Sequence, residues 1–263
     1  MNPVLVRIGL SFFVAGFWIA FATFLGERLG SHKAGLIANL PSNILISMLF
    51  MGITRGPEYA AAATAGVPMG MMVDSVFLAV FIFLLRRGVW VALSLGLAFW
   101  ALSAFVVIVL LPPLGILASL AAYFIVSTGL FILVHRWLGR PKVEKKPVVL
   151  SWKIIALRAF FAGSVVAGAV AVAQVAPPYM TGVLATFPAA LTSTMVIISL
   201  SQGTLFAQAT GKILLLSSTN IIVYAALVSL FFPPLGPWLG TLLSFAGACG
   251  FLLILGKISI RFS

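Results

Sequence analysis

The sequence has few charged residues and almost no cysteine. Of its 263 residues, 8% are Asp, Glu, Lys or Arg, against about 25% in soluble domains, which excludes an ordinary water-soluble enzyme. The single cysteine, Cys249, excludes a disulfide framework, and no Cys/His cluster has metal-ligand spacing. The sequence also lacks a Gly-rich phosphate loop, an HExxH motif and a credible Ser/His/Asp set. We therefore expect no cofactor and no enzymatic activity.

Long charge-free stretches indicate a polytopic membrane protein. Hydrophobic residues make up 62% of the chain, and about 20 apolar residues cross a bilayer. The three longest stretches each hold a proline pair near the centre, and such a pair should end one helix and start another. These pairs are Pro112–Pro113, Pro177–Pro178 and Pro233–Pro234. The pattern predicts nine transmembrane helices, at about 4–25, 34–54, 65–85, 88–111, 114–137, 153–175, 180–201, 212–232 and 235–257.

The distribution of basic residues predicts the orientation. The loop 135–153 is the most basic, so we place it in the cytoplasm. Because successive loops lie on alternate faces of the membrane, this choice puts fourteen of the sixteen Lys and Arg residues on the cytoplasmic face. We expect a multi-pass protein of the inner (cytoplasmic) membrane, with its N-terminus outside and its C-terminus in the cytoplasm. The net charge of +12 thus reports orientation in the lipid bilayer and requires no nucleic-acid partner.

Two parts of the sequence resemble each other at an offset of 147 residues. AGLIANLP at 34–41 resembles TGVLATFP at 181–188, and seven of 29 positions are identical between 34–62 and 181–209. Chance similarity between apolar segments is the alternative, but order and spacing continue in one register. The fifth span has no counterpart in the other copy. This one extra crossing would place the second copy upside down in the membrane relative to the first. The predicted fold is all-α, with two inverted four-helix repeats (1–111 and 151–263) joined by a linking helix and basic loop (112–150).

Asp74 is the one acidic residue that we predict at membrane depth, near the centre of 65–85. Intramembrane ionisable residues are functional candidates by default. Asp74 could bind a cation or proton, or accept a hydrogen bond from a polar substrate. The alternative is a structural carboxyl that is protonated or paired with an arginine.

Further polar residues and prolines fall at similar depth on spans 2, 3, 7 and 8. Proline frees carbonyl groups that side chains, water or substrate must satisfy in a membrane, so a broken helix there suits a solute half-site. A packing kink satisfied by neighbouring hydroxyls is the alternative. The predicted substrate- or ion-binding residues are Asp74, Asn39, Asn43, Ser75, Ser218, Thr219, Asn220 and Thr194, with helix breaks at Pro41, Pro68 and Pro188.

The segment TGVLATFPAALTSTMVIISLSQG at 181–203 resembles the signature of the GlpM-like small four-helix inner-membrane proteins. Gly182, Pro188 and Gly203 carry the resemblance, and Gly35, Pro41 and Gly56 match them in the first copy. The first copy departs from the pattern at Leu40, where the family has Phe. The resemblance implies a fused, inverted pair of such units and says little about substrate.

Two functions remain open from the sequence. The first is a transporter or channel that moves a small solute or ion between inverted halves, with Asp74 as the coupling or binding carboxylate. The second is a non-transporting scaffold or accessory subunit for envelope or polysaccharide assembly. An integral-membrane enzyme is disfavoured, because one buried carboxylate lacks a second acid, a metal site or a nucleophile. Assembly into a homo-oligomer is also left open.

Overall fold

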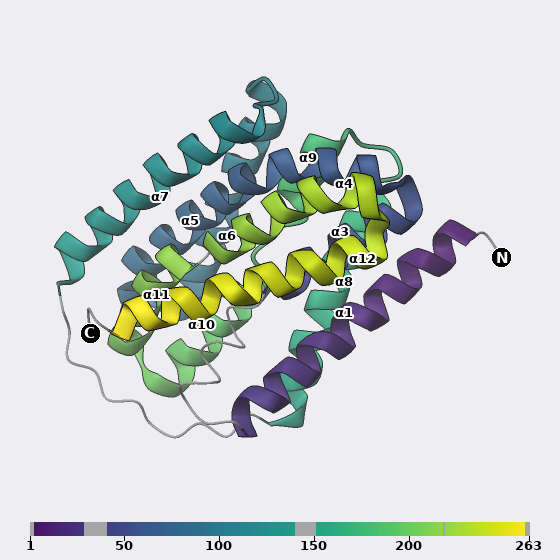
Figure 1. Ribbon diagram of the computed structural model, residues 1–263. Helices are drawn as coiled ribbons and strands as arrows, with labels where there is room; N and C mark the ends of the chain where they lie inside the picture. The colour runs from purple at the N-terminus through teal and green to yellow at the C-terminus, as the bar shows by residue number, and fades with distance from the viewer. Residues whose placement is uncertain (1–2, 29–40, 140–150, 218, 261–263) are drawn as a thin grey trace.

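The computed structural model describes residues 3–28, 41–139, 151–217 and 219–260, and these ranges form helices and no strands. In chain order the elements are α1 (Pro3–Arg28), α3 (Ser42–Arg55), α4 (Pro57–Ala63), the 3-10 turn η1 (Thr64–Gly66), α5 (Val67–Leu84), the 3-10 turn η2 (Leu85–Arg87), α6 (Val89–Phe105), the π-helical turn η3 (Val106–Leu110), α7 (Ile116–Leu138), α8 (Trp152–Val172), α9 (Pro178–Leu184), α10 (Ala189–Gln202), α11 (Thr204–Ser217) and α12 (Thr219–Ile260). Figure 1 shows them as one bundle. The all-helical prediction is confirmed for these residues.

Seven helical stretches in the described ranges are long and apolar enough to cross a membrane. One of them, Thr204–Leu253, contains a bend at Gly236 that separates two helices, and the shorter apolar helix Asn43–Arg55 follows a segment outside the described residues. The count of nine spans therefore stays a prediction. The chain has the composition and helix lengths of a multi-pass membrane protein.

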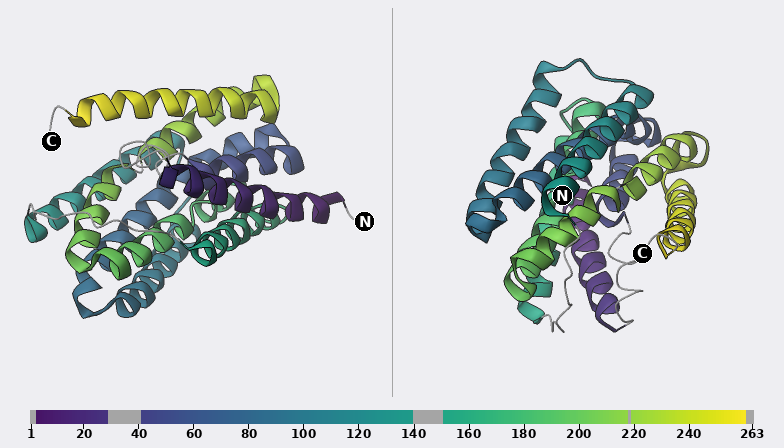
Figure 2. Two further views of the ribbon diagram at one scale, coloured as in Figure 1. Left: turned by 90° about the horizontal axis from the view of Figure 1, so that it is seen from below. Right: turned by 90° about the vertical axis from the view of Figure 1, so that its left-hand side faces the viewer.

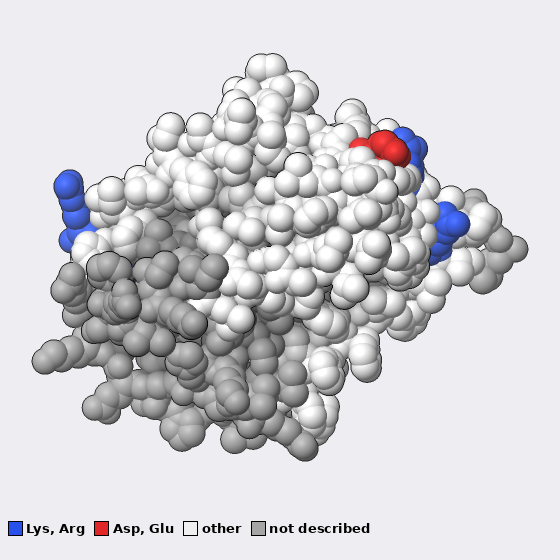
Figure 3. Space-filling model, viewed as in Figure 1, with Lys and Arg blue, Asp and Glu red and all other residues white. Residues whose placement is uncertain are grey.

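The surface of the bundle matches that assignment. In the space-filling view, Lys and Arg side chains gather at two opposite ends. The white surface between these ends, which belongs to described residues, carries no charged side chain (Figure 3). Helix α1 begins at one of these ends, and the C-terminal part of α12 reaches the other (Figure 1). An apolar belt between charged ends is the arrangement expected of helices that span a bilayer.

Two segments differ from the sequence-based expectation. The reversal in the third proline-containing hairpin falls at Gly236 (φ 72°), while Pro233 and Pro234 remain inside α12. A positive φ is open to glycine and closed to proline, whose ring fixes φ near −65°. Segment 57–87 was expected to break near Pro68 but continues through one 3-10 turn. Pro68 is tolerated because it lies in the first turn of α5.

Backbone conformations recur at the offset found in the sequence. Pro41 (φ −75°, ψ 56°) precedes α3, and Pro188 (φ −77°, ψ 43°) precedes α10, which has the same length of 14 residues. Gly56 (φ 97°) ends α3 and Gly203 (φ 91°) ends α10. With one inserted residue the next pair is Gly88 (φ 119°) and Gly236 (φ 72°). Positions 147 or 148 residues apart thus share similar backbone conformations at these turns.

Helices α1 and α8 pack through an exchange-symmetric contact. A Cβ added to Gly16 would lie 3.1 Å from the Ala159 carbonyl oxygen, and one added to Gly163 would lie 2.7 Å from that of Phe12. Gly163 is Gly16 shifted by 147 residues, and Ala159 is likewise Phe12 shifted by 147. The contact of Gly16 with Ala159 and the contact of Gly163 with Phe12 are thus the same contact with the two helices exchanged, as at a two-fold axis. The other views place α6 and the C-terminal part of α12, the last helices of the two halves, on opposite sides of the bundle (Figure 2).

Candidate functional site at the break between α9 and α10

The helix that runs from Pro178 to Gln202 is interrupted. Helix α9 ends at Leu184, residues 185–188 are non-helical, and α10 begins at Ala189. Pro188 lacks an amide donor and disfavours helix at Phe187, which explains the break. Seven residues of α9 rise about 10 Å, roughly a third of the way across a hydrocarbon core about 30 Å thick. A helix that starts at the membrane surface at Pro178 would place this break inside the hydrocarbon core.

Close backbone contact joins this broken helix to α5. A Cβ at Gly70 would collide with the Thr186 side chain and approach the Val183 carbonyl oxygen at 2.8 Å. The Thr186 hydroxyl donates to that same carbonyl oxygen at 2.7 Å, so it satisfies one of the groups freed by the break. One turn earlier, Gly66 and Gly182 let η1 and α9 approach equally closely. The small residues of η1 and α5 thus hold the break against the next turn of α5.

That turn carries Asp74. Its side chain is 3% exposed, and its carboxylate accepts a hydrogen bond of 2.8 Å from the Trp100 indole Nε1 on α6. The Trp100 ring packs edge-on against Phe187 of the break, with 4.8 Å between ring centroids. Trp100 is the one hydrogen-bond partner of Asp74 within the described part of the chain. Asp74, Trp100 and Phe187 therefore link α5, α6 and the broken helix.

A second polar chain leads from α5 through α7 to α12. Ser75 shares a hydrogen bond of 2.8 Å with Ser127, and both side chains are buried. One turn away on the same face of α7, the Tyr123 hydroxyl lies 3.4 Å from that of Thr219. Asn220, the next residue, is fully buried. Helix α7 thus connects Ser75 with Thr219 on α12.

The other predicted site residues lie elsewhere or outside the description. Thr194 accepts a hydrogen bond of 3.2 Å from Arg158 on α8, and Asn43 lies in the first turn of α3. None of the contacts described joins either of them to Asp74. Pro41 precedes α3 directly. Asn39 and Ser218 lie outside the described residues.

Sequence reasoning missed several residues around Asp74. Trp100 was not among the predicted site residues, although it falls in the middle of the predicted span 88–111. Ser127 and Tyr123 lie in the predicted span 114–137, which has no repeat partner and contributed no predicted site residue. Their positions near the middle of predicted spans could have identified them, because a polar atom in the middle of a membrane helix needs a hydrogen-bond partner.

The site contains a single carboxyl group, that of Asp74, surrounded by apolar side chains and a few hydroxyl groups. Among the residues that the structure describes, no three His, Cys, Asp or Glu side chains come close enough to hold a metal ion. Hydroxyl, amide and indole groups can orient a small polar solute or pass a proton, whereas nucleophile–base catalysis needs a second acid–base group. The arrangement therefore suits binding or coupling at one carboxylate.

Replacing Trp100 with phenylalanine is expected to destabilise the protein by about 1–3 kcal/mol, because the buried Asp74 carboxylate loses its donor. In an Asp74→Leu background the same replacement should cost much less, since no acceptor remains to be satisfied. Thermal unfolding of the four proteins in detergent gives the coupling energy of this double-mutant cycle. Equal costs in both backgrounds would show that the hydrogen bond contributes nothing.

Residues 8–112 match a family model described as "Protein of unknown function (DUF3147)". The match starts in α1 and ends in the connection after η3. It covers less than half of the chain. The similarity to GlpM-like proteins is not confirmed by it. Neither the curated proteins nor the solved structures include a match to this chain.

Proposed function

We propose that this protein is a membrane transporter or channel for a small solute or ion, with its site at the break between α9 and α10. The observation that carries the proposal is an interrupted apolar helix that packs against α5 at Gly70, one turn before the buried carboxyl group of Asp74, and against Trp100, which donates to that carboxyl group. Broken transmembrane helices and intramembrane carboxylates mark substrate and ion sites in transporters. Asp74 binds the substrate or the coupling ion, and Trp100 orients it.

The recurrence of turns supports two inverted halves around this site. Equivalent prolines and glycines share backbone angles, and α1 and α8 meet as if across a two-fold axis. The family match from 8 to 112 coincides closely with the first proposed repeat, 1–111. In transporters, inverted repeats let one packing motion open either side in turn. The protein then acts from the inner membrane, with its N-terminus outside.

Hydrogen bonds join neighbouring helices at the end of the bundle that faces outward in this orientation. The Arg55 guanidinium donates to the Gln174 carbonyl oxygen at 3.0 Å. The Tyr59 hydroxyl lies 2.8 Å from the Ala176 carbonyl oxygen and 2.8 Å from the Thr181 hydroxyl. These bonds tie α3 and α4 to the start of α9. The residue equivalent to Tyr59 at the 147-residue offset is Phe206, which has no hydroxyl, so the bond is particular to one end.

Flux measurements test the proposal. The full chain is reconstituted in proteoliposomes, and uptake and efflux of a panel of monovalent ions, protons and small polar solutes are compared with protein-free liposomes. We expect at least one member of the panel to move faster with the protein present. Equal flux with and without protein across ions, protons and neutral solutes would reject transport.

The second candidate function is a non-transporting scaffold or accessory subunit for envelope or polysaccharide assembly. The closed packing of Asp74 against Trp100, with 3% of the side chain exposed, favours it. A scaffold would co-purify with a defined partner from native membranes and would show no flux in the experiment above. Transport with no stable partner would decide against it.

A further inference from the structure

Two helical segments that follow equivalent glycines correspond to each other in the two halves. Gly56 (φ 97°) separates α3 from α4, and Gly203 (φ 91°) separates α10 from α11. Residues 57–63 of α4 therefore correspond to residues 204–210 of α11 at the offset of 147 residues. Helix α4 leads through η1 into the start of α5, whereas a side chain of α11 is bonded to the end of α5.

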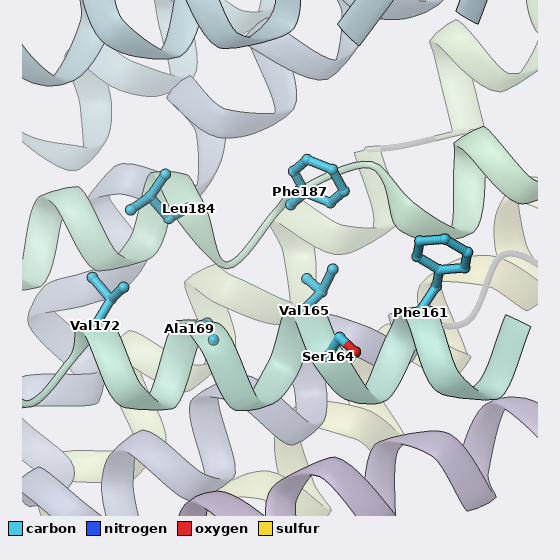
Figure 4. Close-up of a pocket in the computed structure, with 8 residues that line it drawn as sticks. Phe161, Ser164, Val165, Ala169, Val172, Leu184 and Phe187 are labelled. Atoms are coloured by element: carbon cyan, nitrogen blue, oxygen red, sulfur yellow. The ribbon is translucent and has the colours of Figure 1, made fainter. Parts of the chain in front are cut away.

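Helix α5 places these two segments on opposite sides of Asp74. Asp74 lies about 10 Å after Val67, the first residue of α5, and about 12 Å before Ile82 in the last turn. Figure 1 shows α4 toward one end of the bundle and α11 toward the other. Because the Asp74 side chain is 3% exposed, the site is closed toward both ends. The residues beside the break that face α8 are apolar, namely Leu184 and Phe187 (Figure 4).

The α4 end is held by the hydrogen bonds of Arg55 and Tyr59. Their carbonyl acceptors, Gln174 and Ala176, follow the end of α8 at Val172, where backbone carbonyl groups lack partners within the helix. The Arg55 guanidinium also lies over the Tyr59 ring, 4.8 Å from its centroid. The two side chains thus form one contact between the first half of the chain and the second.

The α11 end is held by different side chains. The Gln208 amide donates to the Ile82 carbonyl oxygen at 2.9 Å, and Gln208 is 1% exposed. One turn further along α11, the Lys212 ammonium donates to the Gly139 carbonyl oxygen at 2.7 Å. Gly139 is the C-cap of α7, so the acceptors again lie at the C-terminal ends of helices. Here α11 of the second half is bonded to α5 of the first half and to α7.

The residues that form these bonds differ between the two copies. Tyr59 corresponds to Phe206, which has no hydroxyl, and Gln208 corresponds to Ala61, which has no amide. Lys212 corresponds to Ala65. Each set of bonds therefore belongs to one end of the bundle, and either set can be weakened without changing the other.

We infer that the bonds at α4 and those at α11 are two separate gates on either side of Asp74, and that this structure has both gates shut. The inference rests on the proposed transport function. Loss of the Tyr59 bonds, one of which reaches Thr181 on α9, frees α4 from α9 and opens the site toward the outer face. Loss of the Gln208 bond frees α11 from α5 and opens the site toward the cytoplasm. Inverted repeats allow equivalent segments at opposite ends to make such movements in turn.

Sided chemical labelling tests the two gates. Ser75→Cys places a thiol next to Asp74 at a position that is 3% exposed, in a Cys249→Ala background that removes the one native thiol. A membrane-impermeant maleimide is added to sealed right-side-out vesicles and to sealed inverted vesicles. With both native gates present, we expect slow labelling from either face.

One substitution at each end should open one gate. Tyr59→Phe removes a hydroxyl and introduces the side chain that the second copy has at the equivalent position. It should raise the labelling rate about fivefold from the outer face alone, which is the effect of losing one ordinary hydrogen bond on a two-state opening. Gln208→Met keeps the length of the side chain and loses the amide, and it should give about the same increase from the cytoplasmic face alone. Each variant is the matched control for the other.

The two faces distinguish gating from general loosening of the fold. The inference is overturned if either variant fails to raise labelling, if one variant raises it from both faces, or if both act at the same face. Opposite faces with the sides exchanged would support the gates and reverse the proposed orientation. Labelling needs no transported substrate, so an absence of flux in the liposome experiment would reject transport without deciding whether the two ends open separately.

Discussion

Asp74→Asn is expected to lower the transport rate in proteoliposomes at least about tenfold, equivalent to about 1.4 kcal/mol. The asparagine side chain keeps an oxygen that can accept the Trp100 indole N–H, so the packing between α5 and α6 should persist. What it loses is the carboxylate that binds a cation or exchanges a proton. The drop in rate would therefore report on the function of the carboxyl group, with little contribution from unfolding.

Glu58→Gln provides the matched control. It makes the same chemical change in the first turn of α4, at the end of the bundle where Arg55 and Tyr59 form their hydrogen bonds. Its transport rate should stay close to that of the parent, and both variants should unfold within a few degrees of the parent. If Asp74→Asn is folded and transports a substrate at the parental rate with the parental pH dependence, Asp74 does not have the role that we propose.

Gly182→Leu is expected to have the largest effect on stability. A Cβ on Gly182 would collide with the Ala63 carbonyl oxygen, and the nearby Cα of Gly66 leaves no room on the other side. Both obstacles are backbone atoms, so relief requires α9 to move away from η1. Overpacking of this kind costs about 1–3 kcal/mol or more, which should lower the unfolding temperature by roughly 5–10 °C in a chain of this size.

The same substitution at Gly129 controls for the change in composition. A Cβ there meets nothing within 4 Å, and leucine has a higher helix propensity than glycine by about 1 kcal/mol. Gly129→Leu should therefore unfold at or above the parental temperature, by scanning fluorimetry in detergent. Parental stability in Gly182→Leu would mean that α9 does not pack tightly against η1 and α5, and would weaken the assignment of the site to this contact.

The sequence predicted the helical spans well near the N-terminus and on both sides of the proline pair Pro112–Pro113. The spans expected at 4–25, 88–111 and 114–137 correspond to α1, α6 with η3, and α7. It was less successful where prolines and glycines occur together. At Gly236 the positive φ of glycine determines the reversal, and at Pro68 the first-turn position makes proline compatible with a helix. Residue types alone do not distinguish these cases.

The candidate site was only partly predictable for a related reason. Asp74 stands out in the sequence because a carboxylate within a charge-free run costs free energy that needs an explanation. Its partner Trp100 lies 26 residues away on α6, and Ser127 lies 52 residues from Ser75 on the span without a repeat partner. Pairing between helices depends on their rotation about their own axes, which a single sequence does not specify.

By itself the sequence determined the class of the protein, because apolar content, charge-free length and basic asymmetry are properties of composition and order. It also indicated the proline and glycine positions at which the chain could turn, but Gly236 and Pro68 show that it did not determine which of them turn. The packing of the broken helix against α5 at Gly70 and the hydrogen bond between Trp100 and Asp74 became visible only in the three-dimensional arrangement of the helices. These contacts join residues far apart in the chain, so they follow from helix packing and not from local sequence.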